Sequence, residues 1–284
     1  MRVAIVGKGG SGKSSVSWLL ARQLSKNGAH VLAIDADYNL DFAHNLGWNE
    51  EMQTRFLNQS EADFNTYQQM TPKERHLDLP LREKHIYFSS NPADSYTSKY
   101  MMPSPQDPHI QLAISGKYHE ESLYGNKCAH NYMKMIKYYL PLLQTSRGNY
   151  TIIDSVAGTD MVVYGLYLGI DLLVIVVEPT RHSIGVYHQI KSVAHAFNIP
   201  VRAILNKYQE NEQTKKIEND LGEDLIGKIP LDNAIPLASF DTLQPHTLSA
   251  VNQIQKQLES ISFDPQQAIV RIKEWRLKRK NEEE

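Results

Sequence analysis

The chain has 284 residues, of which 41% are hydrophobic, enough apolar material for a substantial core in one large domain. Its 30 lysines and arginines nearly balance 32 aspartates and glutamates, so no overall charge attracts nucleic acid or an anionic membrane. A single cysteine, Cys128, excludes an internal disulfide and favours a reducing compartment, and the longest apolar stretch is too short to cross a bilayer. We therefore expect a cytoplasmic protein without a signal peptide and without a clear nucleic-acid or membrane signal.

Short runs rich in β-branched residues alternate with helical segments along the chain, as expected where crossover helices connect buried parallel strands. A first helix is predicted to follow residues 7–14, because Val16, Leu19 and Leu24 share one face, and to end near Gly28. We expect an α/β fold with a doubly wound, mostly parallel sheet and helices on both faces, giving three α/β/α layers. The predicted strands are residues 3–6, 31–35, 86–89, 110–115, 150–154, 172–178, 201–206 and 225–229.

The domain organisation is predicted from where this alternation weakens. From about residue 51 to residue 108, polar residues and prolines surround isolated hydrophobic ones, so we expect an irregular, partly helical insertion there. The insertion would belong to a single domain of residues 1–265. Residues 266–284 are predicted to form a charged helical tail that ends in a solvated charge run.

Residues 7–14 read GKGGSGKS and stand between a predicted strand and a predicted helix, which is the setting of a phosphate-binding loop. Glycines let backbone amides converge on phosphate oxygens, and the helix N-terminus adds a favourable potential. Lys13 would bring positive charge to the β and γ phosphates, and the Ser14 hydroxyl would join the Mg²⁺ shell. The sequence therefore predicts a site for ATP and Mg²⁺ formed by Gly9, Gly10, Ser11, Gly12, Lys13, Ser14 and Ser15.

A dinucleotide is the alternative ligand for this loop. Three of its glycines also satisfy G-x-G-x-x-G, and an aspartate after the second predicted strand could bind a ribose. That fingerprint needs neither Lys13 nor Ser14, whereas a triphosphate with Mg²⁺ uses both. A nucleoside triphosphate is therefore favoured over a dinucleotide and over a purely structural glycine turn.

Lys8 favours one class among proteins with a phosphate-binding loop. With this lysine, residues 8–14 resemble the deviant Walker A motif of the MinD/ParA class of P-loop ATPases. Residues 35–37 (DAD) resemble switch I of that class, and residues 154–158 (DSVAG) resemble switch II. The resemblance implies a P-loop NTPase fold, ATP hydrolysis and an ATP-dependent homodimer in which Lys8 reaches the ATP of the partner subunit. The resemblance assigns catalytic roles to Lys8, Lys13 and Asp37, and Asp37 is the residue that would position the attacking water. It also places Ser14, Asp35 and Asp154 in the Mg²⁺ shell and implies that Gly158 contacts the γ-phosphate.

Within this class the sequence is most similar to CooC-type ATPases, which insert nickel into carbon monoxide dehydrogenase. The likeness covers most of residues 1–50 and 110–240, and it implies that Asn206 hydrogen-bonds adenine and that Pro230 lies in a strap on the other side of the base. It is carried by residues 31–40 (VLAIDADYNL), 171–179 (DLLVIVVEP), 203–207 (AILNK) and 227–230 (GKIP).

These roles have structural alternatives. Asp37 and Asp154 are at or just past strand ends, where open α/β sheets place ligand chemistry, but they could be solvated turn residues. Asp35 could brace the loop instead of joining the metal shell. Asn206 could simply end a strand and start a turn.

CooC-type proteins carry a Cys-x-Cys pair that binds metal across the dimer, and the matching residues here are Cys128-Ala129-His130. This chain thus departs from the family's pair, because a histidine stands where the second cysteine is expected. Two chains would still offer two thiolates and two imidazoles, an acceptable set for Zn²⁺ or Ni²⁺ at a dimer interface. In the alternative interpretation Cys128 is a small buried hydrophobic residue and His130 starts a helix.

Two main functions follow from the resemblance. The first is an ATP-gated dimeric ATPase in metallocofactor maturation or metal delivery, acting on a protein client. The alternative is a spatial-organisation ATPase of the MinD/ParA kind that binds membrane or DNA, for which the only support is the basic, ragged apolar tail at residues 269–280. A module that binds another partner under ATP control also fits, because a nucleotide site does not identify the client.

Overall fold

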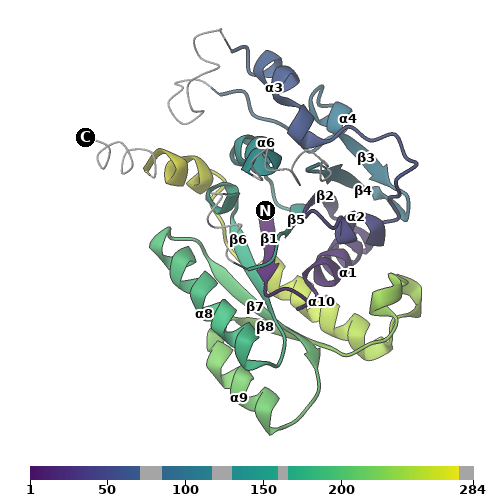
Figure 1. The fold of residues 1–284 in the computed structure, drawn as a ribbon, viewed down its shortest axis with the longest axis vertical. Coiled ribbons are helices and arrows are strands. Elements are labelled where there is room, and N and C mark those ends of the chain that lie inside the picture. Colours follow the sequence, from purple (N-terminus) through teal and green to yellow (C-terminus); the bar gives the residue numbers. More distant parts are fainter. Residues whose placement is uncertain (71–84, 117–129, 159–165, 275–284) are drawn as a thin grey trace, which may run out of the picture.

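A computed structural model describes residues 1–70, 85–116, 130–158 and 166–274. Its centre is an eight-stranded sheet in the order β3-β4-β2-β5-β1-β6-β7-β8, parallel throughout except for β3, which is antiparallel to β4 (Figure 1). The strands are β1 Arg2–Gly7, β2 His30–Ala36, β3 Met101–Ser104, β4 Asp107–Ile114, β5 Asn149–Ser155, β6 Leu172–Val177, β7 Val201–Tyr208 and β8 Leu225–Pro230.

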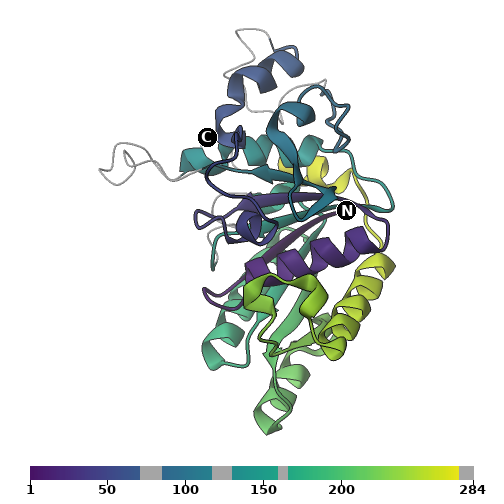
Figure 2. The same ribbon diagram turned by 90° about the vertical axis from the view of Figure 1, so that its right-hand side faces the viewer.

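Helices cover both faces of this sheet. In Figures 1 and 2, α1 and α10 lie side by side on one face, and α6 and α8 lie on the other. The α-helices are α1 Lys13–Lys26, α2 Asp41–Asn45, α3 Glu61–Tyr67, α4 Thr97–Tyr100, α6 His130–Leu142, α8 Arg181–Ala196, α9 Glu212–Leu221 and α10 Pro245–Ser260. Short 3₁₀ helices occur at Leu57–Gln59, Leu166–Gly169, Gly222–Asp224, Ile235–Leu237 and Phe240–Thr242.

The hydrophobic core has two halves because successive strand residues point to opposite faces of the sheet. Val3 and Ile5 of β1 belong to the half that α1 and α10 cover, whereas Ala4 and Val6 belong to the half that α6 and α8 cover. β1 and β6 are buried along their whole length. The predicted three-layer α/β fold is confirmed.

The prediction of a strand at residues 86–89 is wrong. Phe88 makes only an isolated bridge to Leu143, through Phe88 N–H to Leu142 O at 2.9 Å and Gln144 N–H to Phe88 O at 2.8 Å. Its ring packs instead in an aromatic cluster with Phe64, Tyr67, Tyr96 and Tyr139. The apolar pattern of this segment therefore comes from aromatic packing on α6 and not from a place in the sheet.

β3 lies inside the region that the sequence predicts to be an insertion. Met101 pairs with Ala113 and Met102 with Leu112, so this segment adds an antiparallel edge strand beside β4. Pro103 obscures the strand signal, and an edge strand tolerates it because one side of its ladder has no partner strand. The division into a domain, an insertion and a tail stays a prediction.

A buried ion pair lies at the amino end of the sheet. Arg2 Nη2 is 2.6 Å from Asp171 Oδ1, and both side chains are 1% exposed. Arg2 also donates to Pro265 O at 3.0 Å, and Arg271 donates to Ile170 O. Residues 267–274 are helical, and the bond of Arg271 attaches the described part of the predicted tail to the base of the sheet, while the bond of Arg2 holds the residue just before the tail.

Candidate phosphate-binding site

The carboxyl ends of the parallel strands meet at one edge of the sheet, and the loop that follows β1 lies there. Gly7, Gly10 and Gly12 have φ of 148°, 80° and 92°. A Cβ atom on Gly7 would lie 2.5 Å from Val176 O, and one on Gly12 would lie 2.3 Å from Asn206 Nδ2. Gly7 therefore requires glycine for space as well as for conformation, whereas at Gly12 the neighbour is the end of a side chain and the positive φ is the stronger requirement.

The start of α1 is free to receive an anion. Within the part of the chain that the structure describes, no side chain caps this helix, and its first turn contains no acidic residue. Lys13 is its first residue and is only 7% exposed, and the neighbouring Ser11 Oγ is buried without a hydrogen-bond partner. Unbonded amides at a helix start, a buried ammonium group and an unpartnered hydroxyl together fit a phosphate chain.

Ser14 and Asp154 meet directly across α1 and β5. Ser14 Oγ donates to Asp154 Oδ2 at 2.6 Å, and Ser17 Oγ donates to Asp154 Oδ1 at 2.9 Å. Burial raises the pKa of Asp154 to about 7, although the two hydroxyls and Lys13 oppose the rise. Ser17 is a site residue that the sequence analysis missed; its place one turn after Ser14 on the same helix face was an available signal.

Asp35 pairs in register with Asp154 on the neighbouring strand and is also completely buried. Its Oδ1 accepts from Asp37 N–H at 3.0 Å, and its Oδ2 accepts from Ala43 N–H at 2.8 Å. Burial and the nearby charge of Asp154 raise the pKa of Asp35 well above its ordinary value. Asp35 thus braces the loop after β2, and the pair of adjacent buried carboxylates beside Ser14 also fits a divalent cation.

Residues 35–37 and 154–158 lie at the same edge of the sheet as the loop, at the ends of the neighbouring strands β2 and β5. Asp37 is half-buried just past β2, and Gly158 donates its N–H to Gly7 O at 2.9 Å. Gly158 has φ of 75°, and a Cβ on it would meet nothing within 4 Å. The last residue of the predicted switch II motif is therefore hydrogen-bonded to the first residue of the phosphate loop.

Asn206 and Lys207 lie near the carboxyl end of β7 and contact the loop from its other side. Asn206 Nδ2 donates to Ser11 O at 2.8 Å, and Lys207 Nζ donates to Gly10 O at 2.6 Å. The predicted adenine contact of Asn206 remains a prediction beside this observed bond. Pro230 ends the next strand, β8, at the same edge of the sheet and pairs with Tyr208.

The predicted transition-metal pair falls at the boundary of the described residues. Cys128 lies outside the described residues, and His130 is described only as the first residue of α6. Among the residues the structure describes, no three His, Cys, Asp or Glu side chains form a group suited to hold a metal ion. The Cys128 and His130 site therefore stays a hypothesis.

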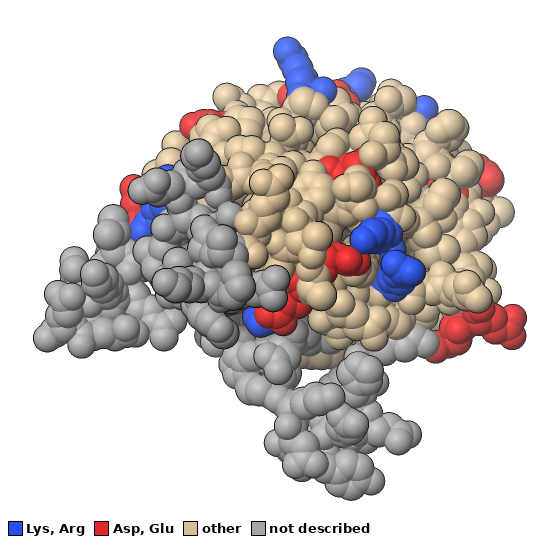
Figure 3. All heavy atoms as spheres, turned by 90° about the horizontal axis from the view of Figure 1, so that it is seen from above, with Lys and Arg blue, Asp and Glu red and all other residues tan. Residues whose placement is uncertain are grey.

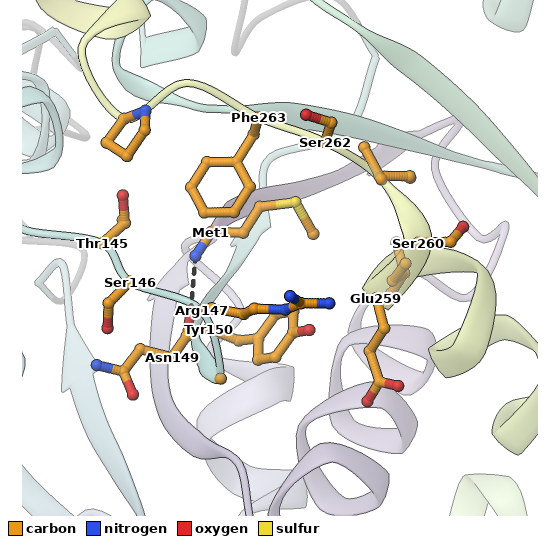
Figure 4. Close-up of a pocket in the computed structure, with 14 residues that line it drawn as sticks. Met1, Thr145, Ser146, Arg147, Asn149, Tyr150, Glu259, Ser260, Ser262 and Phe263 are labelled. Atoms are coloured by element: carbon orange, nitrogen blue, oxygen red, sulfur yellow. Dashed lines mark hydrogen bonds between the residues drawn. The ribbon is translucent and has the colours of Figure 1, made fainter.

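A cavity of about 460 Å³ lies at the opposite edge of the sheet, beside the amino ends of β1 and β5 (Figure 4). Met1, Arg147, Tyr150, Glu259 and Phe263 are among its lining residues. The strands separate it from the phosphate loop, so it takes no part in the site described above.

The molecular face in Figure 3 bears mostly neutral side chains, with lysines, arginines, aspartates and glutamates in small scattered groups. Within the described part of that face, no broad patch of a single charge sign is visible. No helix in the described ranges is both long and apolar enough to span a membrane.

Comparisons with known proteins agree with this geometry. A family model for the CobQ/CobB/MinD/ParA nucleotide binding domain matches residues 3–244. The carbon monoxide dehydrogenase accessory protein CooC of Rhodospirillum rubrum is 30% identical over 252 residues, which are 88% of this chain and 90% of that protein. An ATP-binding protein of Methanocaldococcus jannaschii is 27% identical over 236 residues, 83% of this chain and 90% of that protein.

Solved structures share the fold. The septum site-determining protein MinD of Pyrococcus horikoshii, complexed with Mg-ADP, has a TM-score of 0.61 at 14% identity, covering 91% of this chain and 96% of that one. A plasmid partition protein of Borrelia burgdorferi bound to AMPPNP has a TM-score of 0.61 at 17% identity, covering 92% of this chain and 98% of that one. With a phosphate loop of this geometry and a family match over most of its length, the chain belongs to the CobQ/CobB/MinD/ParA family of nucleotide-binding P-loop ATPases.

Proposed function

We propose that this protein is a Mg²⁺-dependent ATPase that acts as an ATP-gated homodimeric switch. One observation carries the proposal: the uncapped start of α1, Lys13 and the Ser14–Asp154 pair lie together at the carboxyl edge of the sheet. That arrangement offers separate partners to phosphate oxygens and to a divalent cation. The family membership supports ATP as the nucleotide.

The binding roles follow from the charges. The amides of residues 9–14 and the Lys13 ammonium would hold the phosphates, and Ser14 and Asp154 would hold Mg²⁺, with Asp35 supporting the metal site through the loop that it braces. Bound Mg²⁺ would supply positive charge to the phosphate oxygens during transfer. Filling this site also offsets the repulsion between the two buried carboxylates.

For hydrolysis, Asp37 would orient a water molecule for in-line attack, and Lys8 of each subunit would reach the nucleotide of the other. The second lysine adds positive charge where negative charge builds up in the transition state. Loss of the γ-phosphate would release its contact with Gly158. Because Gly158 N–H is bonded to Gly7 O, that release would change the position of the end of the switch II motif relative to the phosphate loop.

The biological role that we propose is metallocofactor maturation or metal delivery to a protein client. The support is the 30% identical relative named as a carbon monoxide dehydrogenase accessory protein, together with the Cys128-Ala129-His130 segment. A homodimer would present two thiolates and two imidazoles, which suit Zn²⁺ or Ni²⁺. A spatial-organisation role is the competing proposal, supported by the fold shared with MinD and plasmid partition proteins.

The central test is titration calorimetry with ATP, with and without Mg²⁺, followed by sedimentation with a slowly hydrolysed ATP analogue. We expect Mg²⁺-dependent binding and a shift from monomer to dimer that Lys8→Ala reduces while leaving monomer binding intact. Absence of ATP affinity in the presence of Mg²⁺ would overturn the proposed function. Binding without self-association would overturn only the dimer.

The maturation role needs its own experiment. Metal content of the analogue-bound dimer is compared between the natural chain and Cys128→Ala, with His109→Ala, at an exposed position, as the control. We expect the metal to be lost only in Cys128→Ala. Equal metal content in all three ends the metal proposal, and ATP-dependent co-sedimentation with anionic vesicles or DNA would favour the spatial role.

A further inference from the structure

One carboxylate joins two lysines beside the phosphate loop. Lys8 Nζ lies 3.0 Å from Glu178 Oε1, and Lys207 Nζ lies 3.3 Å from Glu178 Oε2. The Glu178 side chain is 14% exposed, whereas the two lysine side chains are 35% and 43% exposed. The proposed function uses Lys8 but gives Glu178 and Lys207 no role.

The strand order brings these three residues together. Gly7 pairs in register with Val176, so the chain leaves β1 towards Lys8 and β6 towards Glu178 at adjacent points. Val177 in turn pairs with Leu205 of β7, which places the end of β7 on the other side of Glu178. Residues from three separate parts of the sequence therefore meet because β6 lies between β1 and β7.

The end of β7 has a conformation that turns Lys207 towards the loop. Successive strand residues normally point to opposite faces, yet Asn206 and Lys207 both contact the phosphate loop. The pairing with β8 shifts register between Leu205 and Tyr208, and Lys207 has φ of 56°, which is uncommon for a lysine. A locally strained backbone is thus used to bring this ammonium group to Gly10 O.

Both ammonium groups also donate to the loop itself. Lys8 Nζ is 3.4 Å from Gly9 O, and Lys207 Nζ is 2.6 Å from Gly10 O. Burial alone would raise the pKa of Glu178, but the hydrogen bonds from the two lysines hold that pKa below its ordinary value. Glu178 is therefore ionised at neutral pH and accepts from both lysines at once.

We propose that Glu178 is a positioning residue that holds Lys8 on its own subunit, against its own phosphate loop, in the nucleotide-free protein. This inference rests on the proposed function, because Lys8 must leave Glu178 before it can reach a partner's nucleotide. A triphosphate carries more negative charge than one carboxylate and can compete for the lysine. Lys207 keeps its contacts with Glu178 and Gly10, so the carboxylate is not left without a partner when Lys8 leaves.

The contact can be tested without nucleotide by labelling lysines with an amine-reactive ester and quantifying each site by mass spectrometry. In the natural chain, Lys8 should react more slowly than Lys215, whose side chain is 63% exposed. Glu178→Gln should speed Lys8 labelling about two- to fivefold, the range for an ion pair of this exposure. Glu210→Gln removes the surface partner of Lys215 and should leave Lys8 unchanged.

A second variant keeps the test decisive if Glu178→Gln does not fold. Lys207→Met leaves Glu178 to Lys8 alone, so Lys8 should label as slowly as in the natural chain. Fast Lys8 labelling in Lys207→Met, or unchanged labelling in folded Glu178→Gln, overturns the role of Glu178.

Self-association gives an independent readout. With Mg²⁺ and a slowly hydrolysed ATP analogue, Glu178→Gln should dimerise at a protein concentration several-fold lower, because Lys8 no longer has to leave a carboxylate. An unchanged or higher concentration contradicts the proposal. If titration calorimetry shows no affinity of the natural chain for the analogue in the presence of Mg²⁺, the proposed function fails instead, whatever Lys8 does.

Discussion

Asp35 and Asp154 occupy matching positions on the neighbouring strands β2 and β5, and both are fully buried. Burial removes the water that would stabilise the charge of each carboxylate and raises both pKa values. The charge of Asp154 adds to the rise for Asp35, and the charge of Asp37 adds to the rise for Asp154. The hydroxyls of Ser14 and Ser17 offset only part of this cost. The site is therefore unfavourable when empty and favours a cation.

Asp154→Asn should make the nucleotide-free protein more stable and the Mg-ATP site weaker. Removing one buried charge from the pair is expected to raise the free energy of unfolding by about 1 kcal/mol. The same change should abolish the extra stabilisation by Mg-ATP over ATP in EDTA. Urea unfolding without nucleotide, with Mg-ATP and with ATP in EDTA measures both effects. Asp241→Asn, at an exposed position, is the control. A variant that Mg-ATP stabilises as much as the natural chain would contradict the metal role of Asp154.

Lys13→Ala should lose most of the affinity for ATP. A charged hydrogen bond contributes about 1.5–3 kcal/mol, so the dissociation constant is expected to rise roughly ten- to hundredfold. Titration calorimetry compares this variant with Lys215→Ala, which removes an exposed lysine outside the site. Equal affinities would show that Lys13 does not bind the phosphates.

Asp37→Ala should bind ATP normally but hydrolyse it slowly, because the aspartate is expected to orient water and not to hold the nucleotide. Loss of a general base or water-positioning group lowers the rate by about 10²- to 10⁴-fold. Single-turnover hydrolysis measures this rate, and sedimentation with ATP should show the variant accumulating as dimer. Normal hydrolysis by Asp37→Ala would mean that the assignment of switch I is wrong.

Asp171→Ala should strongly destabilise the fold, because Arg2 would keep its buried charge without a counterion. Loss of one partner from a buried pair costs about 3–5 kcal/mol, whereas replacing both partners by apolar residues costs far less. Urea unfolding of Asp171→Ala and of the double variant Arg2→Met/Asp171→Leu separates the two cases. A double variant as unstable as the single one would show that the hydrogen bonds of Arg2 to Leu140 O and Pro265 O matter more than its charge.

Alkaline pH should unfold the protein through its aromatic cluster. Burial raises the pKa of Tyr139 well above its ordinary value, and burial with a hydrogen bond to Asp94 raises the pKa of Tyr67 to about 12. A raised pKa means that the folded state favours the neutral phenol. The stability is fully present below pH 10, the unfolded value, and is lost as pH rises towards the folded value.

Tyr139→Phe tests this expectation because it keeps the ring and removes the ionising group. Its free energy of unfolding, from urea titrations, should fall less than that of the natural chain between pH 8 and pH 11, by about 1.4 kcal/mol for each pH unit above 10. Tyr87→Phe, at an exposed tyrosine, should behave like the natural chain. If Tyr139→Phe loses as much stability as the natural chain, other groups cause the alkaline unfolding.

Local patterns in the sequence were sufficient to predict the position of the phosphate loop and of most strands. Residues 7–14 form one continuous motif, and strands such as β1 and β6 are apolar because both faces are buried. The roles of Glu178 and Lys207 could not be predicted in this way. Their proximity to Lys8 depends on β6 lying between β1 and β7, an order that differs from the order along the chain.

The remaining differences also have physical reasons. Residues 86–89 look like a strand because Phe88 is buried, but its partners are rings from α3, α6 and the segment before α4. β3 escapes detection because an edge strand needs only one partner and can contain Pro103. In both cases the sequence pattern indicates that a side chain is buried, but the residues that it packs against are determined by the tertiary fold.

The ion pair between Arg2 and Asp171 lies at the amino ends of the strands, while the loop of residues 7–14 lies at their carboxyl ends. A strand of six residues spans roughly 20 Å, so the two regions are far enough apart for their substitution effects to add. Stabilising substitutions can therefore be made first near the amino ends of the strands, and substitutions that destabilise the loop of residues 7–14 can be added afterwards. Fragile variants could then be purified and compared at one temperature without their lower stability being mistaken for lost chemistry.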